Sequence, residues 1–120
     1  MKAMLYEQVS RIGKALSSPK RLEILELLVQ GEKSVDKLAR LAGIDVKLAS
    51  AHLKALREAR LVEARRDGRY IHYCLSNDDV ADLLVKVREA AEAHLIELRV
   101  ALEQMSATPD HLISETRESL

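Results

Sequence analysis

Apolar residues spaced three and four positions apart predict helices along most of the chain. In residues 1–16 they form the stripe of an amphipathic helix, made by Met1, Met4, Leu5, Val9, Ile12 and Leu16. Ser18 followed by Pro19 predicts the start of a second helix, because serine caps a helix N-terminus and proline is tolerated in the first turn. We expect this second helix to end at Gly31.

Two shorter helices should follow. Ser34 can cap the first, "VDKLARLA", which Gly43 would end. Asp45 can cap the second, which would run to about Ala59. Two short helices separated by a turn that contains glycine are typical of a helix-turn-helix.

The segments "LVEARR" and "RYIHYCL" predict a β-hairpin, since Asp67-Gly68 between them favours a type I′ turn. This turn would pair Arg66 with Arg69. One face, with Val62 beside Tyr73 and Ala64 beside Ile71, should cover the core. The other, with Glu63 beside His72 and Arg65 beside Tyr70, should face water or a partner.

A long final helix is expected from about Asn77 to Met105, because apolar residues recur at helical spacing throughout. Its stripe exceeds what a small domain can cover, so we expect an obligate homodimer through the first and last helices. The predicted fold is mostly α with a small β-hairpin, a winged helix-turn-helix of four helices, two strands and a final helix. Residues 1–105 would form the DNA-binding and dimerisation domain. Residues 106–120 would be a tail or linker, in which Thr108-Pro109-Asp110 can start a short helix.

Composition adds limits to this picture. The chain has 120 residues, no Trp or Phe and three Tyr, which predicts one domain with an aliphatic core. The single cysteine, Cys74, forms no internal disulfide and no zinc-ligand spacing. The start of the chain lacks the apolar core of a signal peptide, and no segment resembles a membrane span. We therefore expect a cytoplasmic protein with no membrane partner.

Charge is unevenly distributed although the net charge is zero. Residues 33–72 contain ten Lys and Arg against five acids, whereas the remainder contains nine against fourteen. The basic segment is either a solvated face or a surface for an anion. Because it coincides with a helix-turn-helix and a wing, double-stranded DNA is the expected partner.

In this interpretation the second short helix enters the major groove. Lys47 and Lys54 would meet phosphates. Ser50 and His52 would read base edges, with a packing role as the alternative for His52, and Ala51 would offer an apolar contact. Arg65, Arg66 and Arg69 flank the hairpin tip and would enter the minor groove or hold phosphates.

The segments "LSSPKRLEILELL", "SVDKLARLAGI" and "ASAHLKALREARLVEARRDGRYIHYCL" resemble the ArsR/SmtB family of bacterial repressors, over residues 5 to about 100. The resemblance implies a homodimer that binds an inverted-repeat operator and releases it when an inducer binds. The inducer is unknown, and activation instead of repression stays open. Arg60 stands where a helix-ending glycine is common, and Ala51 where a larger polar residue is frequent. Some relatives carry this module ahead of a rhodanese-like domain.

The metal sites of that family are mostly missing. Ser34, Val35 and Asp36 stand at the positions of a Cys-Val-Cys site. Of a second site only His94 and Glu97 survive, and these can either bridge to a symmetry mate or be interface residues. We expect no metal and no cofactor, with His94 and Glu97 as the remaining candidates.

The sequence also bears on redox sensing, catalysis and protein docking. Cys74 can be an oxidation-sensitive thiol or a small apolar residue, and we favour the second. No enzyme is expected, because the chain offers no phosphate loop, activated nucleophile or pair of carboxylates in an apolar cleft. The alternative to a DNA-binding regulator is a winged-helix module that docks a protein partner.

Overall fold

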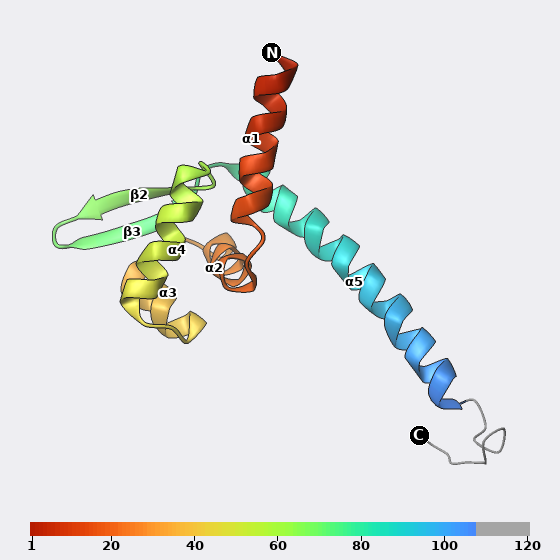
Figure 1. The fold of residues 1–120 in the computed structure, drawn as a ribbon. Coiled ribbons are helices and arrows are strands. Elements are labelled where there is room, and N and C mark those ends of the chain that lie inside the picture. The colour runs from red at the N-terminus through yellow and green to blue at the C-terminus, as the bar shows by residue number, and fades with distance from the viewer. Residues whose placement is uncertain (108–120) are drawn as a thin grey trace. The chain divides into compact units, whose positions relative to one another are not determined.

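The computed structural model describes residues 1–107 and contains five helices and three strands in that range (Figure 1). In chain order the elements are α1 (Lys2–Ala15), α2 (Pro19–Val29), β1 (Lys33–Ser34), α3 (Val35–Ala42), α4 (Val46–Glu58), β2 (Val62–Asp67), β3 (Tyr70–Leu75) and α5 (Asp78–Ala107). Met1–Leu84 forms one compact unit, and the rest of α5 belongs to a second. The tail expected from Thr108 onward lies outside the described residues.

The helix starts follow the predicted caps. The hydroxyl of Ser18 accepts a hydrogen bond from the Arg21 amide at 3.2 Å, directly before Pro19. Ser34 caps α3 in the same way. The Asp45 carboxylate accepts from the Leu48 amide at 2.7 Å, which fixes the start of α4. Each cap satisfies an amide that the helix itself leaves free.

The end of α4 is closed by Arg60, whose φ is +63°. The Leu61 amide donates to the Leu56 carbonyl at 3.0 Å and the Arg60 amide to the Arg57 carbonyl at 2.9 Å. This pair of bonds is a Schellman motif, which glycine normally completes because it has no Cβ. Arginine therefore occupies a left-handed position here, at the place where a helix-ending glycine is common in the family that the sequence resembles.

The core of the first unit is aliphatic, as composition predicted. Ile24, Leu25, Leu38, Leu53 and Leu56 are fully buried. The first turns of α5 complete this core with Val80 and Leu84. α2, α3 and α4 are thus held together by apolar burial, the main favourable term in folding.

The sheet differs from the prediction in two ways. β1 was missed: it pairs with β3, so the strand order is β1-β3-β2. The predicted register was also wrong, because Asp67 pairs with Tyr70 and Arg66 with Ile71. Gly68 (φ +66°) is then the first central residue of the turn, and it alone of the two central residues has positive φ. That pattern is typical of a type II′ turn, for which glycine at this position is suited.

The corrected register shifts each partner by two residues, and a shift of two preserves the faces of a strand. Val62 is buried, while Tyr73 and Leu75 on its face pack against the core. Glu63 and Arg65 lie on the other face and are exposed. The predicted division of the hairpin into a core face and an outer face is therefore confirmed.

Lys33, counted in the basic segment, is 9% exposed. Its ammonium donates to the carbonyls of Leu27 at 2.7 Å and Gly31 at 3.2 Å. A lysine at the C-terminus of α2 satisfies carbonyls that the helix leaves free. This cation stabilises the fold and is not available to an external anion.

In the second unit, α5 continues as one helix from Val85 to Ala107. The apolar stripe that begins with Val80 and Leu84 in the core continues along it, but its later members are exposed: Leu95, Leu98, Leu102 and Met105. The predicted final helix is therefore confirmed, and most of its stripe is uncovered in a single chain.

Candidate nucleic-acid interface

The outer face of α4 carries the helix residues expected to meet DNA. Successive helical residues are offset by about 100°, so positions four and seven apart share a face. Ala49, Leu53 and Leu56 are fully buried and define the inner face of the helix. Lys47, Ser50, Ala51 and Lys54 lie on the opposite face, and all four are exposed. The core thus turns two cations and two small side chains toward solvent.

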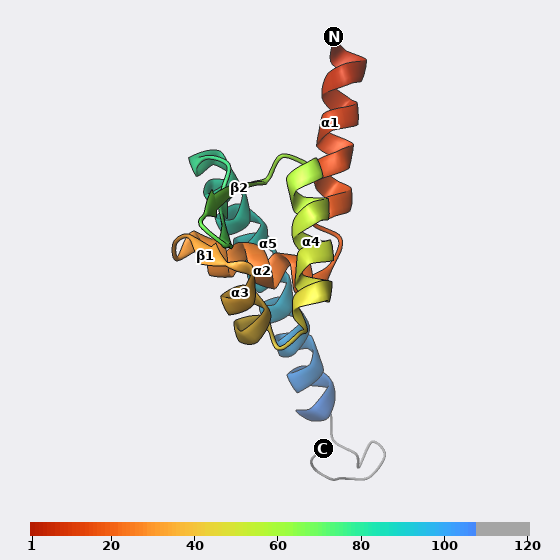
Figure 2. The ribbon, with the colours of Figure 1, turned by 90° about the vertical axis from the view of Figure 1, so that its left-hand side faces the viewer.

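The preceding elements hold α4 in place. Gly43 ends α3 with a φ of +71°, which reverses the chain within the helix-turn-helix. The ammonium of Lys20 donates to the Ala42 carbonyl at this turn, at 2.9 Å, and also to Glu23 at 2.9 Å. In Figure 1, α3, α4 and the hairpin lie on the same side of α2, and Figure 2 shows this side from the front, with α4 and the hairpin on either side of α2.

His52 does not share the outer face. The side chain of His52 is half-buried, and its position on the helix lies about 40° from the buried side. Burial, and then the positive charges of Arg21 and Lys20, lower the pKa of His52 below its usual 6.5. The imidazole is therefore neutral near pH 7, and it lies near α2 instead of beside Lys47 and Lys54.

The wing holds its cations differently. The guanidinium of Arg65 on β2 contacts Glu32 Oε2 at 2.6 Å through Nη2 and 2.9 Å through Nε. Glu32 directly precedes β1, and β3 lies between β1 and β2. Arg65 therefore reaches across β3 on the outer face of the sheet, and its charge is partly neutralised.

Arg66 and Arg69 flank the hairpin tip and are exposed. The Arg66 guanidinium makes one long contact, at 3.5 Å, with the carbonyl of Gly68. Arg69 is a central residue of the turn, so its side chain stands at the end of the wing. These two cations are free to meet an anion in a way that Arg65 is not.

Sequence reasoning missed two features of this surface. Glu32 was not singled out, because only the short strand β1 brings it beside the wing. Val46 and Leu48, at the start of α4, are apolar yet 43% and 44% exposed. Leu48 could have been noticed from the helical pattern, because it falls off the buried face. Val46 could not, because it lies seven residues before the buried Leu53 and so shares its face.

The remaining candidates form no cluster. His94 and Glu97 lie one turn apart on α5, and both are exposed. Residues 1–107 contain no group of three His, Cys, Asp or Glu side chains placed to share a metal ion. Cys74 is a half-buried free thiol on the same face of β3 as His72. In the same range no helix is both long and apolar enough to cross a membrane.

A helix-turn-helix followed by a hairpin wing, with cations on the outer face of the second helix, defines a winged helix-turn-helix domain. The family model for bacterial regulatory proteins of the arsR family matches residues 18–64, from the cap of α2 into β2. The chain belongs to this family.

Relatives agree with this assignment. The HTH-type transcriptional regulator Rv0081 of Mycobacterium tuberculosis is 36% identical over 104 residues, which are 86% of this chain and 91% of that protein. The regulator Rv0324 of the same species is 42% identical over 113 residues, 94% of this chain, and the chain spans only 50% of its length. The probable mercury resistance operon repressor of Streptomyces lividans is 34% identical over 82 residues, 68% of this chain and 66% of that protein.

Among solved structures, the homodimeric winged helix-turn-helix DNA-binding domain of Mb0332 from Mycobacterium bovis superposes with a TM-score of 0.75. It is 47% identical, over 78% of this chain and 87% of that one. The likeness confirms the predicted fold class and adds that a close structural relative is a dimer.

Proposed function

We propose that this chain is a transcriptional repressor that binds double-stranded DNA as a homodimer and releases it when a ligand binds. The observation that carries the proposal is the outer face of α4, where Lys47 and Lys54 bracket Ser50 and Ala51 opposite a fully buried face. Exposed lysines suit phosphates, and small side chains allow the helix to approach base edges closely. Arg66 and Arg69 would hold the backbone beside the groove.

The homodimer is supported by uncovered apolar surface. On α1, Met4, Leu5 and Val9 are each more than half exposed. The stripe of α5 is exposed beyond Leu84. Side chains of this kind on two helices would be covered by a second copy. The relative Mb0332 is homodimeric, which supports this part of the proposal. Two α4 helices related by a two-fold axis would address half-sites of an inverted repeat about 34 Å apart.

Control by a ligand would act through the dimer helices. A ligand lowers DNA affinity only by as much as it favours a dimer shape in which the two α4 helices are misplaced. Repression is supported by the name of the Streptomyces relative. We further propose that the protein acts in the cytoplasm, where bacterial DNA is found, and that it catalyses no reaction.

The proposal is tested by fluorescence anisotropy with DNA from the protein's own promoter region and a scrambled duplex, at several salt concentrations. If Lys47, Lys54, Arg66 and Arg69 meet phosphates in both subunits, the logarithm of affinity should fall with the logarithm of salt concentration with a slope of about −7. The promoter duplex should bind more tightly than the scrambled one. The same titration in the presence of zinc would show whether metal binding at His94 and Glu97 changes DNA affinity.

A protein-docking module is the second candidate, and the exposed stripe of α5 is the observation that favours it. It predicts no binding to either duplex, or binding that does not respond to salt. Such a result would overturn the repressor proposal.

A further inference from the structure

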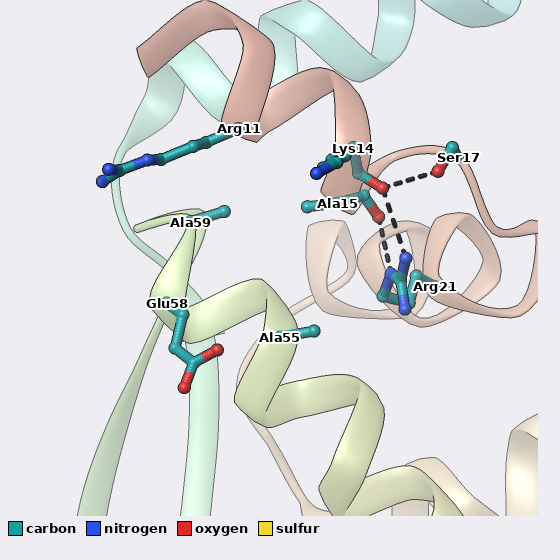
Figure 3. A pocket seen from close by; sticks show the side chains of 8 residues that line it. All are labelled: Arg11, Lys14, Ala15, Ser17, Arg21, Ala55, Glu58 and Ala59. Carbon is teal, nitrogen blue, oxygen red and sulfur yellow. Dashed lines mark hydrogen bonds between the residues drawn. The ribbon is translucent and has the colours of Figure 1, made fainter. Parts of the chain in front are cut away.

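A hollow of about 510 Å³ lies where α1, α2 and α4 meet in the first unit. It is lined by Arg11, Lys14, Ala15, Ser17, Arg21, Ala55, Glu58 and Ala59 (Figure 3). Its volume is within the range of known small-molecule sites, roughly 300–1,000 Å³. None of the residues expected to touch DNA lines it.

The hollow exists because the helices meet through alanines. Ala15 and Ala59 are buried at 6% and 7% exposure, and their methyl groups point toward one another across the space in Figure 3. Ala55, one turn earlier on α4, adds a third methyl group to the wall. The inner surface is therefore apolar, and larger side chains at these positions would fill it.

The surroundings of the hollow are cationic. Three of the lining residues are basic and one, Glu58, is acidic. The guanidinium of Arg21 is held in place, because it donates to the Ala15 carbonyl at 2.7 Å and the Lys14 carbonyl at 3.2 Å. The Lys14 ammonium makes no hydrogen bond or ion pair within residues 1–107, and in Figure 3 it extends to the same side as the Ala15 methyl group.

Glu58 does not neutralise that lysine. Its carboxylate points away from Ala15 and Lys14 in Figure 3 and has no ion-pair partner in the described chain. Arg11 runs along the rim, where one guanidinium nitrogen donates to Gln8 at 3.3 Å. An unpaired ammonium over an apolar wall matches a ligand with one negative charge and an apolar body.

We propose that this hollow binds a small organic carboxylate, with the charge on Lys14 and the apolar body against the three alanines. The inference rests on the proposed function only for the effect that the ligand would have on DNA binding. A ligand here would contact both α1, a proposed dimer helix, and the C-terminal half of α4, so it is placed to shift the position of α4 relative to the dimer partner. The site itself would bind its ligand whether or not the protein binds DNA.

The test uses the full chain and the probe 4-tert-butylbenzoate, followed by amide chemical shifts in ¹H–¹⁵N spectra. The amides of Ala15, Ala55 and Ala59 should shift in a saturable way. The neutral isostere 4-tert-butylbenzamide should bind about tenfold more weakly, since it loses the charge-assisted contact. Inorganic phosphate, which has no apolar body, should bind more weakly than the benzoate.

Two variants separate charge from shape. Lys14→Ala should weaken benzoate binding about tenfold, while Lys2→Ala, which removes a lysine elsewhere on α1, should leave it unchanged. Ala55→Leu should abolish binding, because the larger side chain occupies the part of the hollow where the apolar body would pack, and leucine keeps the helix propensity of α4. Thermal unfolding by circular dichroism checks that each variant folds.

Equal binding of the acid and the amide, shifts centred elsewhere, or no shift at 10 mM probe, roughly the weakest affinity worth calling a site, would overturn the proposal. So would an Ala55→Leu protein that becomes monomeric, because a second copy would then be what fills the hollow. Anisotropy titration of promoter DNA with and without the benzoate keeps the two proposals apart. DNA binding without benzoate binding contradicts only the carboxylate site, and the reverse contradicts only the repressor.

Discussion

α4 and the wing both present cations, but the fold treats these cations differently. On α4 the position of Lys47 and Lys54 is set by a fully buried opposite face. On the wing, Arg65 is tied to Glu32 across β3, and only Arg66 and Arg69 at the tip are free of an acidic partner. The core holds α4 along its buried face, whereas it holds only the base of the wing, through Val62, Tyr73 and Leu75. Beyond that base the wing depends on its own hairpin pairing and on the ion pair of Arg65 with Glu32.

This difference shows why a count of charges overstates a binding surface. Of the basic segment, Lys33 satisfies the end of α2, and Arg65 is partly neutralised by an acid that lies just outside the segment. The charge of each of these side chains already has a partner within the protein, so it contributes less to binding an external anion. We therefore expect DNA affinity to depend on α4 most strongly, on the wing tip next, and on Arg65 least.

The largest effect is expected for Leu53→Ala, which removes a fully buried side chain beneath the outer face of α4. The lost burial and the cavity should lower the free energy of unfolding by about 2–5 kcal/mol. Urea unfolding measures this. Leu48→Ala is the matched control on the same helix, because Leu48 is 44% exposed; it should change stability by less than about 0.5 kcal/mol. Equal losses would mean that α4 is not positioned by its buried face.

Removing the outward cations should leave the fold intact and reduce DNA binding. We expect Lys47→Ala with Lys54→Ala to weaken affinity on the order of 100-fold and to make the salt slope shallower by about 4, since a dimer loses four phosphate contacts. Anisotropy titration measures both quantities. Lys2→Ala with Lys86→Ala is the control, because it removes the same charge outside the basic segment. A loss of affinity with an unchanged salt slope would contradict phosphate contact.

The wing is tested by comparing Arg65→Ala with Arg69→Ala. Arg69→Ala should weaken DNA binding several-fold more, because Arg65 is already engaged by Glu32. Glu32→Gln should release Arg65, raise DNA affinity a few-fold and steepen the salt slope by about 2, one added contact per subunit. If Arg65→Ala costs as much as Arg69→Ala and Glu32→Gln has no effect, Arg65 contacts DNA despite its ion pair.

The helix caps and the strand faces depend on neighbouring residues alone, and both could be predicted from the sequence. Ser18, Ser34 and Asp45 were identified as caps from their side chains alone, and each caps its helix. The faces of the hairpin were also predicted, since alternation along a strand does not depend on the turn. The register was not, because Asp-Gly is compatible with more than one turn and only the pairing in the folded chain selects one.

What the sequence could not show depends on contacts between distant residues. β1 is two residues long and has no pattern of its own, so the ion pair of Glu32 with Arg65, 33 residues away, could not be anticipated. Lys33 appeared to be a surface cation until α2 placed its carbonyls nearby. The hollow beside Lys14 likewise needs three helices to meet, and alanines on separate helices give no signal in one dimension.

The connection between α4 and the wing can be tested at Arg60, which closes α4 and leads into β2. Arg60→Gly should raise the free energy of unfolding by about 0.5 kcal/mol, because relief of the left-handed strain slightly exceeds the added entropy of the unfolded chain. Arg57→Gly, inside the same helix, should instead lower it by about 1 kcal/mol. Urea unfolding distinguishes the two. A loss of stability in Arg60→Gly would show that the arginine side chain contributes more than its backbone costs.

The smallest effect is expected at His52, on the inner side of α4. Burial and the charges of Arg21 and Lys20 lower the pKa of His52 below 6.5, so the unfolded chain takes up this proton more readily than the folded one. Stability from the neutral imidazole is therefore complete above pH 6.5 and declines as pH falls through that value toward the folded pKa. Between pH 7.5 and 5.5 (about one pH unit either side of the ordinary value), the wild type should lose more stability in urea unfolding than His52→Gln, which cannot titrate. A wild type that gains stability relative to the variant on acidification would mean that His52 has an acidic partner instead of the two cations of α2.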